Sequence, residues 1–429
     1  MTFPEIFRAT RSDFKPLKLV LSFFTVQLLS LAIYSVFSQS PGFESGLFKT
    51  LFWLQIIVIC GLGFQRLAES VSKERLEKTW DFQRLTPLTS FEITFGKFIG
   101  APLYALFLGA CFLPMLIFLW MGVPELRSSA LTHYELAIAL ILFLYALSLL
   151  ISSYTETNSR GAGIIGLFFI AAFSSSTSFL SKLPDETFYY GISLPTIHFH
   201  TIATVLFGFW AFFGAQWRIG KDLMESRKIW RLPSFLLFLI VYILGFGASN
   251  FYISSHVTST ALGAVALFSW IAAFANDERI DHWKIWLQHR KGIEKWNYTP
   301  MWIQSVTILL IFAVLACILI PEYRERPAAI IFALFILRDM LFLQWCRFTR
   351  SIRPSVLAVI YITLGYGIPI AFLAAAGLKD FFFVVTPGTE AKLSDLPLHI
   401  FPVILQIAGL IWLNKVWLDR GLRPAAPSQ

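Results

Sequence analysis

The sequence predicts an all-α, polytopic transmembrane helical bundle of about 12 spans, built as two six-helix halves. The chain has 429 residues, of which 56% are hydrophobic and only 14% are charged. Its mean hydropathy of +0.67 is far above that of a water-soluble protein. Leu, Ile and Phe recur in blocks of about 20 residues, the length at which a helix crosses about 30 Å of hydrocarbon. Lipid is therefore the expected solvent of this chain.

Apolar blocks between charged segments place the individual spans. In the first half we expect spans at residues 17–38, 47–64, 98–120, 134–153, 161–179 and 201–217. In the second half we expect spans at residues 234–251, 258–275, 301–320, 328–345, 356–378 and 398–416. A similar polar break precedes the fifth span of each half, at 152–160 and 345–353. This similarity predicts domains at residues 1–217 and 218–429, the second a degenerate copy of the first.

The distribution of basic residues orients the chain in the membrane. Most of the 35 Lys and Arg fall in alternate loops, at residues 65–97, 218–231, 276–300 and 347–355. We therefore expect an integral protein of the plasma (inner) membrane with both termini in the cytoplasm. The net charge of +9 is spread along the chain and forms no basic domain, so we expect the lipid bilayer and no nucleic acid as a partner.

The loop at residues 65–97 carries the most information. Charged residues 74–78 favour a short surface helix with an apolar stripe, and Pro87 ends this helix. Thr89 and Glu92 form a T-x-x-E capping box that begins the helix leading into the third span. Such a surface helix either transmits force from a soluble partner or only anchors the loop at the membrane surface, and its pattern leaves both open. The expected stripe consists of Leu76, Trp80 and Leu85.

This loop resembles that of the type 2 ATP-binding-cassette (ABC) permeases, which reads approximately E-R-E-x-G-T-W-D-L-L-L-x-T-P-L-S-x-x-E-I-x-x-G-K. Lys78 stands in place of the family's glycine, and Gln83 and Arg84 replace an apolar pair. The resemblance implies that residues 74–88 form the coupling helix, which docks on a nucleotide-binding subunit. The residues that match and would bind this partner are Glu74, Arg75, Thr79, Trp80, Asp81, Leu85, Thr86, Pro87, Leu88 and Glu92, and the match continues through Ile93, Gly96 and Lys97.

The resemblance also implies a function. The chain would be the membrane-spanning permease subunit of an ABC transporter, of the exporter type, driven by a separate ATP-binding subunit docked at 74–88. The sequence has no G-x-x-x-x-G-K-[ST] phosphate loop, so we expect the chain to be a transport subunit without its own ATPase site. It would bind no cofactor, and its partner would use the ATP. Two halves in one chain predict one copy per complex, although the second-half loop at 277–300 keeps only Glu-Arg and a terminal Thr-Pro.

Arg338 and Asp339 lie near the middle of the tenth expected span. An unpaired charge there costs at least about 2.5 to 3.5 kcal/mol, so both side chains should face the bundle interior. Neighbouring helix positions point about 100° apart, so we expect each to pair with other helices more than with its neighbour. A structural ion pair and a place on the translocation path both stay open.

Two other functional classes also stay open. An ion-coupled secondary transporter would use Arg338 and Asp339 as its coupling site and would need no ATPase. A polytopic membrane enzyme would need acidic residues or histidines gathered at one membrane face, and here they are scattered. His198 and His200 have a spacing seen at metal sites, but no further ligand accompanies them, so we expect no metal.

Overall fold

In the computed structural model of the chain, helices dominate both of the compact units into which it divides. The described residues are 14–38, 43–122, 126–154, 185–223, 225, 230–249, 252–253, 255–275, 283, 299–320, 323, 327–348, 362–377, 384 and 396–422. Unit 1 comprises Met1–Thr187 and Ser193–Ser226, and unit 2 comprises Phe188–Ile192 and Arg227–Gln429. That the two units derive from one repeated half stays a prediction.

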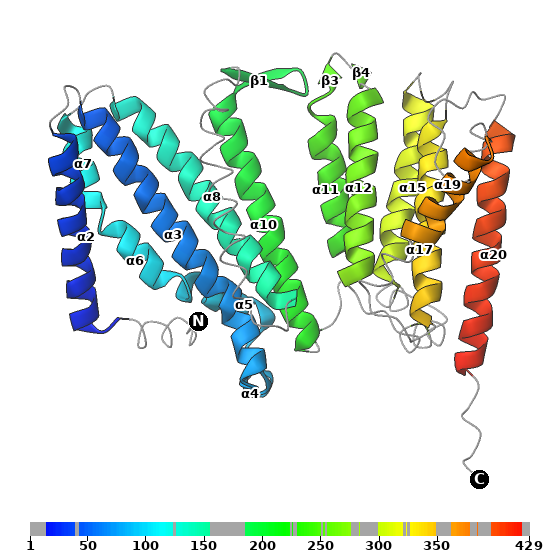
Figure 1. Ribbon diagram of the computed structural model, residues 1–429, viewed down its shortest axis with the longest axis horizontal. Helices are drawn as coiled ribbons and strands as arrows, with labels where there is room; N and C mark the ends of the chain where they lie inside the picture. Colours follow the sequence, from blue (N-terminus) through cyan, green and yellow to red (C-terminus); the bar gives the residue numbers. More distant parts are fainter. Residues whose placement is uncertain are drawn as a thin grey trace, which may run out of the picture. The chain divides into compact units, whose positions relative to one another are not determined.

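The helices of unit 1 follow one another along the chain and pack side by side (Figure 1). Helices α8 and α10 run in the same direction (Figure 1). One further crossing of the membrane between them, as expected at 161–179, would require this. The expected span itself lies outside the described residues. The β1–β2 hairpin leads into α10. The helices of unit 1 are α2 (Pro16–Phe37), α3 (Phe43–Leu76), α4 (Trp80–Arg84), α5 (Ser90–Gly100), α6 (Leu103–Ala110), α7 (Leu113–Gly122), α8 (Leu126–Tyr154) and α10 (Thr196–Asp222). The strands β1 (Glu186–Tyr189) and β2 (Ile192–Pro195) are divided between the units, because Phe188–Ile192 belongs to unit 2.

Unit 2 contains a second group of apolar helices and one small antiparallel ribbon. Its π-helix η2 leads directly into α19, so the eleventh expected span is not one regular α-helix over its described part. The elements are α11 (Arg231–Leu244), β3 (Ala248–Ser249), β4 (Tyr252–Ile253), α12 (Ser255–Ala275), α15 (Met301–Leu319), α17 (Ala328–Phe348), η2 (Ile362–Gly367), α19 (Ile368–Ala375) and α20 (Leu396–Leu422).

Nine helices in the described part of the chain are long and apolar enough to cross a membrane, which indicates an integral membrane protein. Their bounds are Pro16–Phe37, Phe43–Leu76, Ser90–Ala110, Leu131–Tyr154, Thr196–Asp222, Ser255–Ala273, Met301–Leu319, Ala328–Cys346 and Leu396–Asp419. Three further apolar helices are shorter: Leu113–Gly122, Arg231–Leu244 and Gly365–Ala375. The expected total of about 12 spans is not confirmed by this set.

Two expected spans differ from the helices of the structure. The helix that contains the second expected span, 47–64, is longer than that span, because α3 continues as one helix of 34 residues to Leu76. The third expected span is not one helix over 98–120, because the stretch Ser90–Ala110, which α5 and α6 form together, ends at Ala110 and α7 begins at Leu113. Pro102 lies between α5 and α6, and Pro114 lies in the first turn of α7. Proline cannot donate the backbone hydrogen bond that a continuous helix needs, which accounts for interruptions at these places.

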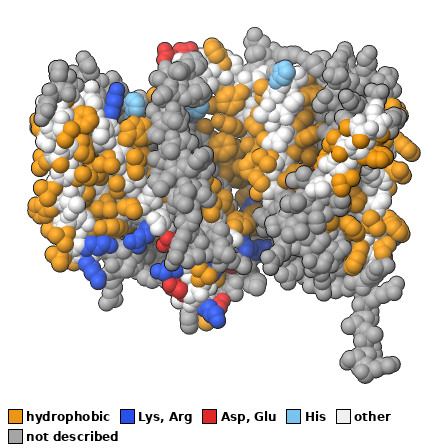
Figure 2. Space-filling view, viewed as in Figure 1, with side chains coloured by type: hydrophobic (Ala, Val, Ile, Leu, Met, Phe, Trp, Pro, Cys, Tyr) orange, Lys and Arg blue, Asp and Glu red, His pale blue; other side chains and the backbone are white. Residues whose placement is uncertain are grey.

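Each unit has its own apolar core. In unit 1 the core lies between α3, α7 and α8, where Gly63 lets the Tyr145 side chain approach the α3 backbone closely. The Tyr145 hydroxyl donates a 2.9 Å hydrogen bond to the carbonyl oxygen of Ile59. The sides of unit 1 expose hydrophobic side chains, and charged side chains gather near its lower end (Figure 2). This distribution is the one expected of a unit surrounded by lipid.

Candidate functional site

The loop at residues 74–88 is a compact turn of chain between the end of α3 and the start of α5. It extends beyond the ends of the neighbouring helices of unit 1, with the short helix α4 at its tip (Figure 1). Helix α3 ends at Leu76, and Lys78 adopts a left-handed conformation with φ of 58°. This conformation ends the helix and turns the chain into α4, as a glycine commonly does at the same place. The chain therefore reverses over a very short distance.

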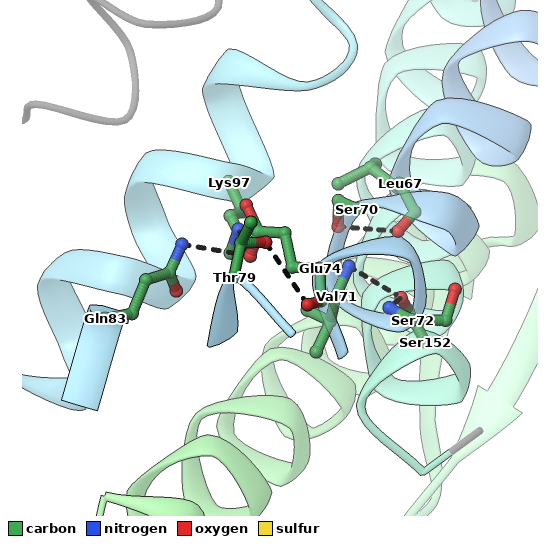
Figure 3. Close-up of polar contacts among 9 residues, drawn as sticks. All are labelled: Leu67, Ser70, Val71, Ser72, Glu74, Thr79, Gln83, Lys97 and Ser152. Atoms are coloured by element: carbon green, nitrogen blue, oxygen red, sulfur yellow. Dashed lines mark hydrogen bonds and ion pairs between the residues drawn. The ribbon is translucent and has the colours of Figure 1, made fainter. Parts of the chain in front are cut away.

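Glu74 is the polar centre at the base of the loop (Figure 3). Its carboxylate oxygen Oε2 lies 2.6 Å from Nζ of Lys97 on α5 and accepts a 2.9 Å hydrogen bond from Nε2 of Gln83 on α4. All three side chains are buried, with Glu74 only 6% exposed and Lys97 only 3% exposed. Glu74 thus joins α3, α4 and α5 through one carboxylate. Glu74, one of the residues expected to bind a partner, is therefore buried within the chain and does not lie at the exposed surface of the loop.

Trp80 is buried inside its own chain, with 3% of its surface exposed. Its ring belongs to the apolar core of unit 1 and lies 5.6 Å from the Arg75 guanidinium carbon and 5.9 Å from Nζ of Lys97. Leu76 and Leu85 are instead exposed, Leu85 to 82%. The expected stripe of Leu76, Trp80 and Leu85 is therefore wrong. A five-residue helix after a sharp turn does not continue the periodicity of α3, so these three side chains do not share a face.

Further contacts fasten the base of the loop to α8 and α10. The backbone N–H groups of Val71 and Ser72 both approach Oγ of Ser152 on α8, at 3.1 and 3.3 Å (Figure 3). Arg75 forms an ion pair with Asp222 at the end of α10. Helices α3, α8 and α10 are therefore joined by polar contacts at the end of unit 1 that carries the loop.

The start of α5 is also held firmly. Oγ of Thr89 accepts a hydrogen bond from the Glu92 N–H, and the Glu92 carboxylate accepts one of 3.0 Å from the Thr89 N–H, which confirms the predicted capping box. The Glu225 carboxylate accepts two hydrogen bonds from Ser90, of 2.7 Å from its N–H and 2.6 Å from its hydroxyl. The helix leading toward the membrane is thus fixed at its first turn.

The tip of the loop faces outward. Asp81, Leu85, Thr86 and Pro87 are exposed, while Leu88 is half-buried against the core. Within the tip, the Thr86 hydroxyl donates a 2.7 Å hydrogen bond to the Gln83 carbonyl oxygen. The Thr79 hydroxyl donates one of 3.2 Å to the Glu74 carbonyl oxygen. The residues expected to bind a partner therefore divide into a buried group that shapes the loop and an exposed group that a partner can reach.

Lys78 provides a direct test of the loop geometry. A residue other than glycine in the left-handed region is disfavoured by about 1 kcal/mol or more, and a β-branched residue is worse. We expect Lys78→Gly to raise the free energy of unfolding by about 0.5 to 1 kcal/mol and Lys78→Val to lower it by about 1 to 2 kcal/mol. Equilibrium unfolding in mixed detergent micelles measures both. Equal stability of the Gly and Val variants would show that the turn is not left-handed in solution.

Arg338 and Asp339 form a second polar centre, buried in unit 2. Contrary to expectation they pair with each other, with Nε and Nη2 of Arg338 at 3.0 and 2.8 Å from Oδ1 of Asp339. They also contact other elements, because Nη1 of Arg338 donates to Gln406 on α20 at 3.1 Å and the Tyr366 hydroxyl donates to Asp339 at 2.8 Å. The two residues point about 100° apart around the helix, but the Arg338 side chain is long enough to bend back and reach Asp339.

Several residues at these centres were not among the expected site residues. Lys97 is part of the motif shared with the type 2 ABC permeases. It is also a lone lysine in the apolar stretch Phe95 to Ile99, and a buried lysine needs an acidic partner, so the sequence does contain a signal for its role. Asp222 and Glu225 lie far from the loop in sequence, so only the fold brings them to it. Among the described residues no group of His, Cys, Asp and Glu could hold a metal ion.

No protein-family model, no curated protein and no solved structure matches this chain. The interpretation of the loop therefore rests on its own sequence and geometry.

Proposed function

We propose that the chain is the membrane-spanning permease subunit of an ABC transporter, of the exporter type, driven by a separate ATP-binding subunit that docks on residues 74–88. The observation that carries this proposal is the position of the family-like motif. The motif falls on the element that extends from the end of unit 1, and its tip is exposed. The loop contacts α5 through Glu74 and Lys97 and contacts α10 through Arg75 and Asp222. The adjoining end of α3 contacts Ser152 of α8.

The contacts at the base suit a part that transmits force. A displacement of the tip is passed to α3 and α5 together, because Glu74 bonds both Gln83 on α4 and Lys97 on α5. Arg75 extends the connection to α10 through Asp222. Closure of an ATP-binding dimer against the tip would then tilt these helices as a group and alter the packing of the bundle. Such rigid shifts of packed helices are an established way of switching between two conformations.

The rest of the assembly follows from the same proposal. The side of unit 1 that carries the loop faces the cytoplasm, both termini lie there, and the membrane is the plasma (inner) membrane. About 12 spans form two six-helix halves, so one copy of the chain serves a pair of ATP-binding subunits. The chain has no ATPase site of its own, binds no cofactor and relies on ATP used by the partner.

Purification of the full-length chain in mild detergent tests the proposal. We expect a soluble ATP-binding protein to copurify, and mass measurement of the complex to give one copy of the chain for two copies of that protein. Two copies of the chain per ATP-binding dimer would contradict the duplication. Two findings together would contradict the proposed function. The homogeneous preparation would contain no ATP-binding protein, and the purified chain would stimulate ATP hydrolysis by no ATP-binding protein added to it.

The network around Arg338 and Asp339 favours a second candidate function, an ion-coupled secondary transporter. Ionisable residues buried within membrane spans commonly mark ion or proton pathways. Here Arg338, Asp339, Tyr366 and Gln406 connect α17, η2 and α20 in unit 2. Transport in proteoliposomes that follows an imposed ion gradient and needs no ATP would support this candidate over the first.

A further inference from the structure

A groove on the outside of unit 1 combines an apolar lining with two lysines at one end. It has a volume of about 470 Å³ and lies along α2, with Leu108 of α6 on its other wall. The lining includes Leu17, Leu21 and Val26 of α2. Only 11% of the apolar window of α2 is buried, so this helix is at the periphery and the groove opens toward the surrounding lipid. Nothing in the proposed coupling mechanism uses this groove.

The polar groups of the groove follow one stripe of α2. Lys15, Lys18, Ser22 and Thr25 line it, and their spacing of three or four residues places them on one face of the helix. Nζ of Lys18 lies 3.8 Å from the centroid of the Tyr104 ring, and the Tyr104 hydroxyl lies 2.8 Å from Oγ of Ser22. Tyr104 therefore ties α6 to α2 and holds the Lys18 ammonium at the mouth of the groove. Lys15, one turn earlier, is exposed.

The order of these groups along the membrane normal matches that of a phospholipid. The two ammonium groups lie at the end of α2 where the helix enters the apolar region, which is the depth of lipid phosphates. The distance along the helix axis is about 6 Å between Lys18 and Ser22, and about 6 Å between Ser22 and Val26. Positive charge, then hydroxyl groups, then an apolar wall thus follow in the order of phosphate, glycerol and acyl chain. Basic clusters at this depth attract anionic lipids.

We propose that the groove between α2 and α6 is a binding site for an anionic phospholipid. Lys15 and Lys18 hold the phosphate, and one acyl chain lies along Leu21, Val26 and Leu108. The bound lipid fills the gap beside a peripheral helix and so fastens α2 to the rest of unit 1. This site is independent of the ATP-binding partner, so its failure and the failure of the proposed function are separate outcomes.

Native mass spectrometry of the purified full-length chain with added dioleoylphosphatidylglycerol tests the site, with dioleoylphosphatidylcholine as the uncharged comparison. The double variant Lys15→Gln and Lys18→Gln is expected to weaken phosphatidylglycerol binding roughly twentyfold, and Lys15→Gln alone about fivefold. Phosphatidylcholine binding should change little. The control is the double variant Lys49→Gln and Lys73→Gln, which loses the same charge at two exposed lysines of α3 and should bind phosphatidylglycerol like the wild type.

Two further arms separate a lipid site from simpler explanations. Leu21→Trp, at a 58% exposed position, fills the groove and should weaken binding even though both lysines remain. Free glycerophosphoglycerol, which has the headgroup without acyl chains, should not compete. The proposal would be overturned if Lys15→Gln or Leu21→Trp left phosphatidylglycerol binding unchanged. It would also be overturned if the control variant lost as much binding, or if the free headgroup competed fully.

Discussion

Replacing Lys97 by Met is expected to lower the free energy of unfolding by about 3 to 5 kcal/mol. Nζ of Lys97 lies 2.6 Å from Glu74, and both side chains are buried, so the substitution leaves a carboxylate in the protein interior without its cation. Gln83 still donates one hydrogen bond to that carboxylate, but one neutral donor offsets only part of the cost of burying the charge. Equilibrium unfolding in mixed detergent micelles, followed by circular dichroism, measures the loss.

The double variant Glu74→Gln and Lys97→Met provides the decisive control for this pair. It removes both charges, keeps a side chain that can bond Gln83, and should recover most of the stability lost by Lys97→Met alone. Lys73→Met is the exposed comparison, because Lys73 lies 3.8 Å from Glu77 with both side chains largely in solvent. We expect it to change stability by less than about 0.5 kcal/mol. A loss in Lys97→Met no larger than in Lys73→Met would contradict the buried pair.

Replacing Trp80 by Ala is expected to cost about 3 to 5 kcal/mol of stability, the range found when a large aromatic side chain is removed from a core. The ring is 3% exposed and packs in the core of unit 1 beside Arg75 and Lys97. Its loss therefore leaves a cavity at the base of the loop at 74–88. Differential scanning fluorimetry together with equilibrium unfolding measures the effect.

Leu85→Ala is the matched comparison on the same loop. Leu85 is 82% exposed, so we expect its truncation to change the free energy of unfolding by less than about 0.5 kcal/mol. Wild-type stability of Trp80→Ala, combined with loss of a partner protein, would mean that Trp80 is exposed in solution and contacts the partner directly. That result would contradict the buried position described above.

Local signals in the sequence predicted some of this site and not the rest. The capping box at Thr89 and Glu92 depends on residues three positions apart, so its pattern alone predicted the start of α5 correctly. The orientation of Trp80 depends on the left-handed turn at Lys78, and lysine gives little sign of such a turn. The ion pairs of Arg75 and Lys97 join residues distant in sequence, so they become visible only once the helices are packed.

The same distinction applies to the fold. Apolar length predicted most of the long helices of the described residues within a few positions, because hydrocarbon thickness sets that length. It did not predict that α3 continues to Leu76, since a helix outside the lipid needs only a buried face and α3 has one through Leu67 and Val71. Pro102 and Pro114 are the sequence signals for the interruption of the third expected span, and they lie within a continuously apolar segment that by itself predicts one uninterrupted span.

Leu85→Asp tests the central proposal, that the tip of the loop at 74–88 binds an ATP-binding subunit. The measurement is the amount of ATP-binding protein that copurifies with the full-length chain, together with ATP hydrolysis by the complex in nanodiscs. Phe188→Asp in the β1–β2 hairpin is the control, because Phe188 is also strongly exposed, at 68%. We expect Leu85→Asp to fold like the wild type but to lose at least about tenfold in bound partner, as for a hot-spot residue, while Phe188→Asp retains it. A well-folded Leu85→Asp variant with wild-type partner binding and ATP hydrolysis would contradict the account.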